Sequence, residues 1–181
     1  PENDRQMETD KCDDYSFHCV LEHKRTKTFA GCIRLVIPPA DNPQLKLPFE
    51  ESCLESAIPG AIDTQRLPRG GFGEISRLAV KADFRRRKTD QFKGSGTGVI
   101  AEATYSEVEL RCFPFIAIGL YMAAATMAID TGLKHVYVMM EPRLARSMKF
   151  VGIKFIPLGA PIEYHGLRAP YYISPDIFLA N

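Results

Sequence analysis

Hydrophobic and polar positions alternate in short runs along much of the chain, and this pattern predicts a sheet with a few helices. Residues 17–21 and 31–37 have the alternation of half-buried strands, and the polar stretch between them predicts a hairpin turn. Residues 74–80 follow a glycine-rich segment and form a further strand candidate. Residues 135–140 are almost wholly apolar, as expected of a strand covered on both faces.

The longest apolar stretch has no charged residue from Cys112 to Ile129. Its length reaches the lower limit for a membrane span. Pro114 suits the first turn of a helix, Gly132 suits the position after its last turn, and three consecutive alanines allow close packing on a sheet. This capping pattern favours a helix buried in a globular domain over a membrane helix.

The remaining elements complete a sheet-and-helix order. A shorter helix is predicted over 142–152, and terminal strands over 154–156 and 170–173, whereas the proline-rich stretch 38–68 predicts no long regular element. Strand, helix, strand, helix, strand is typical of an α/β or α+β fold with a right-handed crossover. Because the chain has 181 residues, we expect one domain over 1–181.

Composition narrows the function classes. The chain is 45% hydrophobic and 25% charged, which is ordinary for a globular domain. The formal net charge of +1 argues against a general binder of nucleic acid or other polyanions. Residues 1–22 are mainly acidic and residues 66–93 mainly basic, so we expect an acidic and a basic surface.

The five cysteines predict neither a disulfide framework nor a zinc site, because their number is odd and no CxxC pair is present. A reducing cytoplasm fits this pattern best, and no signal peptide is visible. The four histidines lie far apart in sequence, and none has a nucleophile nearby. We therefore expect no bound metal.

The strand predicted over 74–80 carries the most informative polar side chains. A carboxylate and a hydroxyl on one face of a strand can together hold an amine or a water molecule. A surface salt bridge at the rim of a sheet explains the same pattern, and both interpretations remain open. In a regular strand, Arg77 lies on one face and four others lie opposite: Glu74, Ser76, Leu78 and Val80.

Two charged runs lie outside the predicted strands. Adjacent guanidinium groups repel one another unless they are solvated or paired with anions, so the basic run is a solvated loop or a docking site for phosphate or carboxylate. The acidic run receives a cationic amine or forms a solvated, partly disordered end, and pattern alone favours the second. The basic run is Arg85, Arg86, Arg87 and Lys88, after Phe84, and the acidic run is Glu8, Asp10, Asp13 and Asp14.

Motifs in chain order resemble the Gcn5-related N-acyltransferase (GNAT) superfamily, in the branch of acyl-homoserine-lactone synthases and N-acyl amino acid synthases. E-x-D-x-x-D begins at Glu8, G-x-x-R-L at Gly31 and E-x-S-R-L-x-V at Glu74. Five further segments are similar to segments of acyltransferases associated with PEP-CTERM and exosortase systems. They are SRLAV, FRRR, PFIAIGLY, MEPRLAR and EYHGLRAPYY. The resemblance implies a mixed central sheet flanked by helices, with splayed central strands.

The resemblance also implies an activity. The implied activity is that of an acyltransferase. Such an enzyme moves a long-chain acyl group from acyl carrier protein or acyl-coenzyme A to an amino acid or another small amine, as autoinducer synthases do. The phosphopantetheine arm of the donor enters between the strand ending near Val80 and the strand 135–140. The amine attacks the thioester directly, so no covalent acyl-enzyme is required.

Site residues carried over from the resemblance fall into three groups. The catalytic group is Glu74 as the base, with Ser76 and Arg77, and the acceptor group is Asp10, Asp13 and Arg34. Alternatively, Arg34 and Arg77 form buried ion pairs that stabilise the sheet. The donor group is Leu78, Val80, Phe84, Arg85, Arg86, Arg87, Met139 and Met140.

Departures from the family pattern refine these expectations. The chain has no glycine between Phe84 and Gly94, where the fold usually places its phosphate loop, and this favours acyl carrier protein over coenzyme A. No lactone-specific feature is visible, which favours an amino acid over S-adenosylmethionine. Four apolar side chains line an acyl tunnel or simply pack the core: Phe115, Tyr121, Met139 and Met140. A coenzyme A-dependent acetyltransferase and a non-catalytic acyl-carrier or lipid-binding module are the alternatives.

Overall fold

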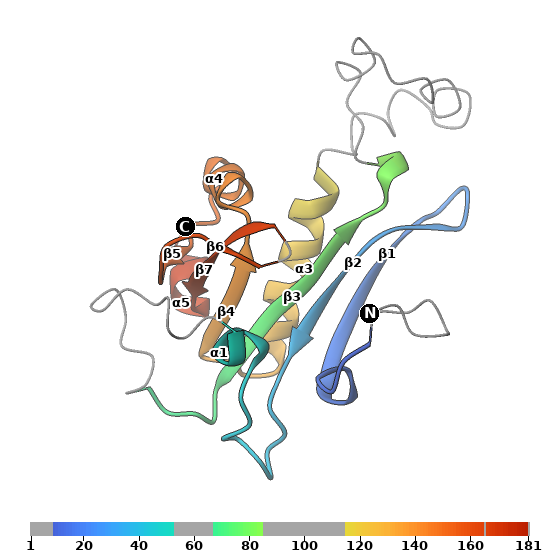
Figure 1. The fold of residues 1–181 in the computed structure, drawn as a ribbon. Coiled ribbons are helices and arrows are strands. Elements are labelled where there is room, and N and C mark those ends of the chain that lie inside the picture. The colour runs from blue at the N-terminus through green and yellow to red at the C-terminus, as the bar shows by residue number, and fades with distance from the viewer. Residues whose placement is uncertain (1–8, 53–66, 85–114, 165, 181) are drawn as a thin grey trace.

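A computed structural model describes residues 9–52, 67–84, 115–164 and 166–180 (Figure 1). Five predictions concern residues outside these ranges. They are the basic run Arg85, Arg86, Arg87 and Lys88, the loop over 88–111, Pro114 in the first turn of a helix, residues 53–66 of the proline-rich stretch, and the part of the acidic run at Glu8.

A mixed sheet of seven strands forms the centre of the fold (Figure 1). Its order is β1-β2-β3-β4-β7-β5, and β6 pairs with β7. Only β3 and β4 pair in parallel among the described strands. The strands are β1 (Ser16–His23), β2 (Thr28–Val36), β3 (Phe72–Val80), β4 (His135–Met140), β5 (Ile156–Pro157), β6 (Ile162–Glu163) and β7 (Leu167–Ile173).

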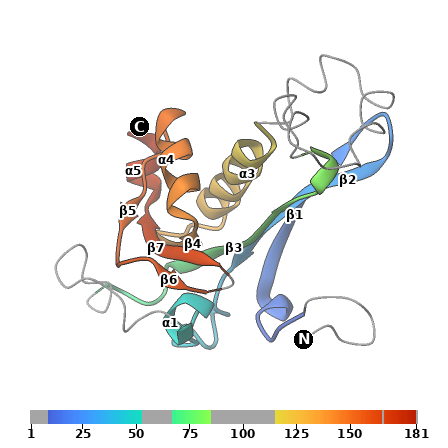
Figure 2. The same ribbon diagram turned by 45° about the horizontal axis from the view of Figure 1, so that its top comes forward.

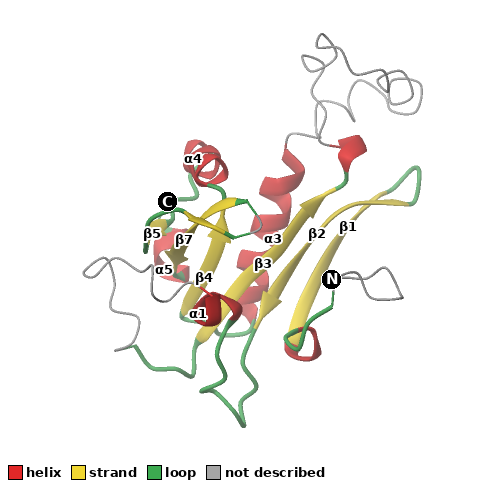
Figure 3. Ribbon diagram, in the orientation of Figure 1, coloured by secondary structure: helices red, strands yellow, loops and turns green. Residues whose placement is uncertain are grey.

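Helices cover both faces of this sheet, and each face has its own apolar core (Figures 2 and 3). The larger core lies under α3 (Ile116–Asp130), α4 (Pro142–Phe150) and α5 (Pro175–Leu179). The smaller core lies under α1 (Pro48–Ser52), where Phe49 packs beside Tyr137 and Tyr172. Short 3-10 turns lie at Asp13–Tyr15 and Ala82–Phe84.

Most predicted elements are confirmed with shifted ends. The hairpin consists of β1 and β2, and α3 packs on the sheet as the apolar stretch predicted. Gly132 and Gly152 have φ angles of 73° and 92°, and each follows the end of a helix, as glycine at this position commonly does. The fold class is also confirmed: a mixed sheet flanked by helices.

Other predicted boundaries are wrong. β7 begins at Leu167 rather than at 170, because a turn at Gly166 with a φ angle of 98° pairs it with β6. The strand expected over 154–156 is only Ile156–Pro157. Helices α1 and α5 were not predicted, since five residues are too few to show a helical period.

Gly31 allows α3 to lie close to β2 and β3. A Cβ atom there would lie 2.6 Å from the carbonyl oxygen of Ala79 and 2.9 Å from Cδ1 of Leu120. A larger residue would therefore push the sheet and the helix apart. This close packing fixes the end of β3 that is paired with β2 but not with β4, next to the site described below.

The two parallel central strands separate partway along their length. Their register runs from Phe72 opposite His135 to Ile75 opposite Val138 and then stops, although β3 continues to Val80. The predicted splay is therefore confirmed: the last residues of β3 and of β4 leave unpaired backbone edges that face one another.

Candidate active site

A groove of about 780 Å³ opens where β3 and β4 separate. Its volume lies within the usual range of small-molecule sites, roughly 300 to 1,000 Å³. Of the residues predicted to contact the donor, Leu78, Met139 and Met140 line this groove, as does Tyr121 from α3. The strand ends thus form a space large enough for a substrate.

Glu74 lies in the wall of this groove and is only 2% exposed. Its Oε2 atom accepts a hydrogen bond of 2.7 Å from the backbone N–H of Phe49. Burial raises the pKa of Glu74 to about 8, although the Phe49 hydrogen bond and the charge of Arg34 act to lower it. Glu74 can therefore release and take up a proton near neutral pH, as a general base must.

The segment that carries Phe49 is held by an ion pair. Glu50 accepts a hydrogen bond of 2.9 Å from the backbone N–H of Leu47, and Arg69 forms an ion pair with Glu50. Arg69 also donates to the carbonyl oxygen of Leu45 at 2.8 Å. These contacts hold α1 over Glu74. The sequence analysis missed this role, although Pro48 and two glutamates have the composition of a first helical turn.

Four charged side chains, which we call the charge cluster, lie beside Glu74: Asp10, Asp13, Arg34 and Arg77. Nη1 of Arg34 lies 2.8 Å from Oδ1 of Asp10 and 2.7 Å from Oδ1 of Asp13. Nη2 of Arg77 lies 2.9 Å from Oδ2 of Asp10, and its Nη1 lies 3.3 Å from Oδ2 of Asp13. Each arginine therefore bridges both aspartates, and the four formal charges cancel.

The charge cluster is partly buried, and its members stabilise one another. Arg34 is 2% exposed, and its Nε donates a hydrogen bond of 3.0 Å to Oγ of Ser76. Burial acts to raise the pKa values of Asp10 and Asp13, but their hydrogen bonds and the nearby arginine charges lower both below the usual range. For Asp10 and Asp13, the prediction of a solvated, partly disordered end is therefore wrong.

The face predicted for Arg77 is also wrong. Ser76 pairs with Arg34, but Ala79 pairs with Cys32, so β3 has one more residue than β2 in this interval. Arg77 has a φ angle of 50°, which a residue with a side chain rarely adopts. This bulge brings the Arg77 side chain to the aspartates that Arg34 also contacts.

The bulge reverses the alternation that follows it. Leu78 and Val80 pack against the core under α3, whereas Glu74 contacts Phe49 on the α1 side. Leu78 still reaches the groove through the gap between the strands, but Val80 is not among the groove residues. The expectation that Val80 shares a face with Glu74 is therefore incorrect.

Two predicted aromatic contacts lie away from the groove. Phe84 is 1% exposed and packs in the core, with its ring centroid 5.8 Å from that of His23. A side chain enclosed in this way does not contact a docked donor, so this prediction is wrong. Phe115 is 60% exposed at the start of α3 and does not line the groove either.

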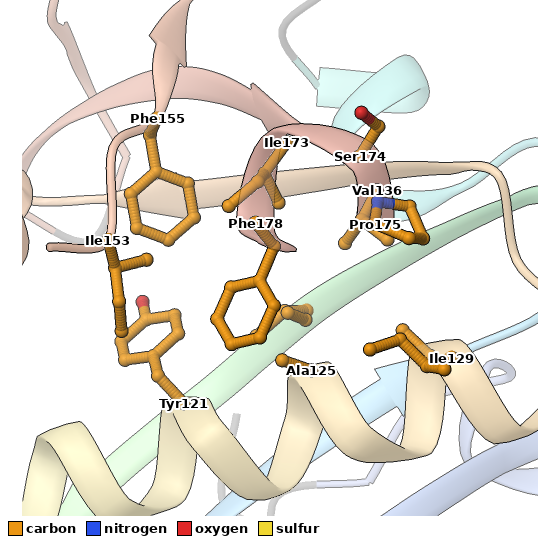
Figure 4. A pocket seen from close by; sticks show the side chains of 12 residues that line it. Tyr121, Ala125, Ile129, Val136, Ile153, Phe155, Ile173, Ser174, Pro175 and Phe178 are labelled. Carbon is orange, nitrogen blue, oxygen red and sulfur yellow. The ribbon is translucent and has the colours of Figure 1, made fainter. Parts of the chain in front are cut away.

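A second, apolar cavity lies between α3 and α5 (Figure 4). Phe178 points into it from α5, and Ala125 and Ile129 border it on α3 (Figure 4). Its volume is about 30 Å³, roughly the space of one water molecule. It shares Ile75 and Tyr121 with the groove, so the two spaces adjoin.

Within the described ranges, no group of three or more His, Cys, Asp or Glu side chains is placed to hold a metal ion. None of the helices in those ranges is long and apolar enough to cross a membrane.

The sheet, its splayed strands and the groove define an acyltransferase fold. The sequence profile of the acetyltransferase (GNAT) domain matches residues 1–93, just over half of the 181 residues. The chain belongs to this family, and the predicted enzyme class, an acyltransferase of the GNAT type, is confirmed. The similarity to PEP-CTERM-associated enzymes stays a prediction. No curated protein matches the sequence.

Solved structures with the same fold include an acyl-homoserine lactone synthase and an N-acyl amino acid synthase. TofI in a ternary complex with an inhibitor and MTA has a TM-score of 0.65 and 17% identity, over 99% of this chain and 76% of that one. FeeM, an N-acyl amino acid synthase from uncultured soil microbes, has a TM-score of 0.56 and 14% identity, over 92% and 76%. BjaI, a CoA-dependent acyl-homoserine lactone synthase with SAM and isopentyl-CoA, has a TM-score of 0.55 and 18% identity, over 98% and 68%.

Proposed function

We propose that this protein transfers an acyl group from a thioester donor to the amine of a small acceptor, in the groove between β3 and β4. One observation carries the proposal: Glu74, a buried carboxyl group with a raised pKa, lines the groove where the two strands separate. The fold shared with FeeM and BjaI, which are named as acyl-transferring synthases, supports it.

The donor arm lies along the unpaired edge of β3 beyond Ile75 and bonds to its backbone as an added strand would. The amine nitrogen attacks the thioester carbonyl carbon, so that an N–C bond forms and the C–S bond breaks. Glu74 takes the amine proton, and the leaving thiolate is protonated from water. A backbone N–H on the open edge stabilises the oxyanion, a contribution of roughly 3 to 4 kcal/mol in other enzymes.

Acyl carrier protein is the proposed donor, with acyl-coenzyme A as the alternative. The acidic helix and single phosphate of acyl carrier protein suit the basic run from Arg85 to Lys88, which lies outside the described residues. We further propose a long acyl chain that passes Tyr121 toward the apolar cavity. Because that cavity is small, the chain must displace side chains such as Phe178. We also propose that the polypeptide forms one domain and acts in the cytoplasm.

The experiment supplies purified protein with acyl carrier protein or coenzyme A thioesters of short, medium and long chains, and with a panel of amino acids and simple amines. We expect N-acyl product by mass spectrometry and free thiol in equal amounts. Leu78→Trp, which fills the groove, abolishes product, whereas the exposed control Leu179→Trp does not. Thiol release without N-acyl product would contradict the proposal, and turnover restricted to acetyl-coenzyme A would favour the acetyltransferase alternative.

A further inference from the structure

The groove has a second charged region, which we call the arginine wall: Glu141, Arg143 and Arg168. Glu141 follows the end of β4, and Arg143 lies in the first turn of α4. Arg168 lies on β7, one residue before Ala169, which pairs with Met140. All three residues therefore gather where β4 ends.

The arginine wall differs from the charge cluster because its charges do not cancel. None of its three members has an ion pair within 4.0 Å with a residue that the structure describes. One acid and two bases leave an excess positive charge. Burial raises the pKa of Tyr121, and the nearby charge of Arg168 acts to lower it.

The two arginines lie on different sides of the sheet. Alternation along β7 places Arg168 on the same face as Tyr172, which packs in the core with Phe49. Phe49 donates to Glu74, so Arg168 and Glu74 share the α1 side of the groove. Arg143 belongs to α4, which covers the opposite face together with α3 (Figure 2).

We propose that Arg168 binds the carboxylate of an α-amino acid acceptor and thereby places its amine at Glu74. The proposal rests on the proposed function and narrows its acceptor to amino acids. A guanidinium group matches a planar carboxylate with two parallel hydrogen bonds. The arginines of the charge cluster already bind Asp10 and Asp13, whereas Arg168 forms no ion pair with a described residue and lies on the side where Glu74 lies.

A phosphate of the donor is the other anion that the arginine wall can attract. Because the proposed acyl path passes Tyr121 of α3, we place the donor arm on the side of α3 and α4, where a donor phosphate that reaches the arginine wall meets Arg143 rather than Arg168. The experiment must therefore separate the acceptor from the donor.

The test compares amino acids with the amines that lack only their carboxylate: phenylalanine with phenethylamine, and leucine with isoamylamine. For each pair, kcat/KM is measured for the wild type and for Arg168→Met. We expect the wild type to prefer the amino acid and Arg168→Met to lose at least about tenfold of that preference, with the amine rate unchanged. Arg168→Lys restores part of the preference, and Arg146→Met, an exposed residue outside the groove, changes nothing.

Three results overturn the assignment or the function beneath it. An unchanged preference in Arg168→Met overturns the role of Arg168 alone. A higher KM for the donor, equal with both acceptors, assigns Arg168 to the donor phosphate instead. If no acceptor is acylated, the proposed function fails, and calorimetry still tests Arg168: the wild type binds the amino acid and not the amine, and Arg168→Met binds neither.

Discussion

The groove is bordered by two charged regions that are built in opposite ways. In the charge cluster, two arginines and two aspartates bridge one another within 3.3 Å and their charges cancel. In the arginine wall, Arg143 and Arg168 line the same groove without an ion pair to any described residue. Both are rich in arginine, but only the second has charge left over for a ligand.

This difference separates holding a site together from binding a substrate. Partly buried charges are tolerated when they are paired, and breaking such a pair leaves an uncompensated charge. The charge cluster joins the segment before β1 to β2 and β3, so we expect its loss to lower stability. An unpaired arginine at a groove adds little to stability, and we expect its loss to alter selectivity.

The largest expected effect is the loss of Arg34. Arg34→Met leaves Arg77 as the remaining arginine at Asp10 and Asp13, and we expect the free energy of unfolding in urea to fall by roughly 3 to 5 kcal/mol. The control is Lys11→Met, which breaks the exposed pair with Glu51 and costs less than about 1 kcal/mol. Adding Asp13→Asn to Arg34→Met leaves Asp10 paired with Arg77, so the charges cancel again and part of the loss is recovered. If it recovers nothing, uncompensated carboxylates are not the cause.

The pH dependence of stability is the next test. The pKa of Glu74 is raised in the folded protein from the ordinary 4.5 to about 8, so the folded state holds this proton more tightly than the unfolded state. Its contribution to stability is full below about pH 4.5 and is lost as the pH rises through about 8. The change amounts to a few kcal/mol, since one pKa unit corresponds to about 1.4 kcal/mol. Glu74→Gln flattens this slope in urea titrations at several pH values, and an equally steep slope in the variant would contradict the assignment.

Two substitutions of Arg77 test whether the bulge in β3 strains the backbone. Arg77→Ala loses the ion pairs and keeps an unfavourable φ of 50°, whereas Arg77→Gly loses the same pairs but adopts that φ without strain. We expect both variants to be less stable than the wild type and the glycine variant to exceed the alanine variant by about 1 kcal/mol. Thermal or urea unfolding measures the difference. Equal stabilities would mean that the backbone at Arg77 is not strained.

The smallest expected effect belongs to the arginine wall. Arg168→Met removes no ion pair to a described residue, so we expect the free energy of unfolding to change by about 0.5 kcal/mol or less. Urea unfolding at neutral pH is the measurement. A loss as large as that of Arg34→Met would place Arg168 in the scaffold and remove the contrast between the two regions.

The sequence motifs identified the residues of the charge cluster, because a carboxylate pair and two arginines at fixed spacings are visible in the chain. They did not reveal how these residues meet. The bulge at Arg77 depends on how β2 and β3 pair, which alternation within one strand does not show. Likewise, the contact of Phe49 with Glu74 joins segments 25 residues apart. In the sequence Phe84 resembles an exposed loop residue, but in the structure it belongs to the core under α3. The proposed role of Arg168 could not be predicted, because it depends on the absence of an ion pair with the described residues, which a sequence does not show.

The most direct test of acyl transfer in the groove is the rate of N-acyl product formation by the wild type and by Glu74→Gln, measured above pH 8 with matched donor and acceptor. Glutamine keeps an oxygen that accepts the Phe49 hydrogen bond but cannot take a proton from the amine. We predict a rate about 100- to 10,000-fold lower for the variant, and a wild-type rate that rises with pH and levels off above about 8. Turnover by Glu74→Gln at the wild-type rate would contradict the account.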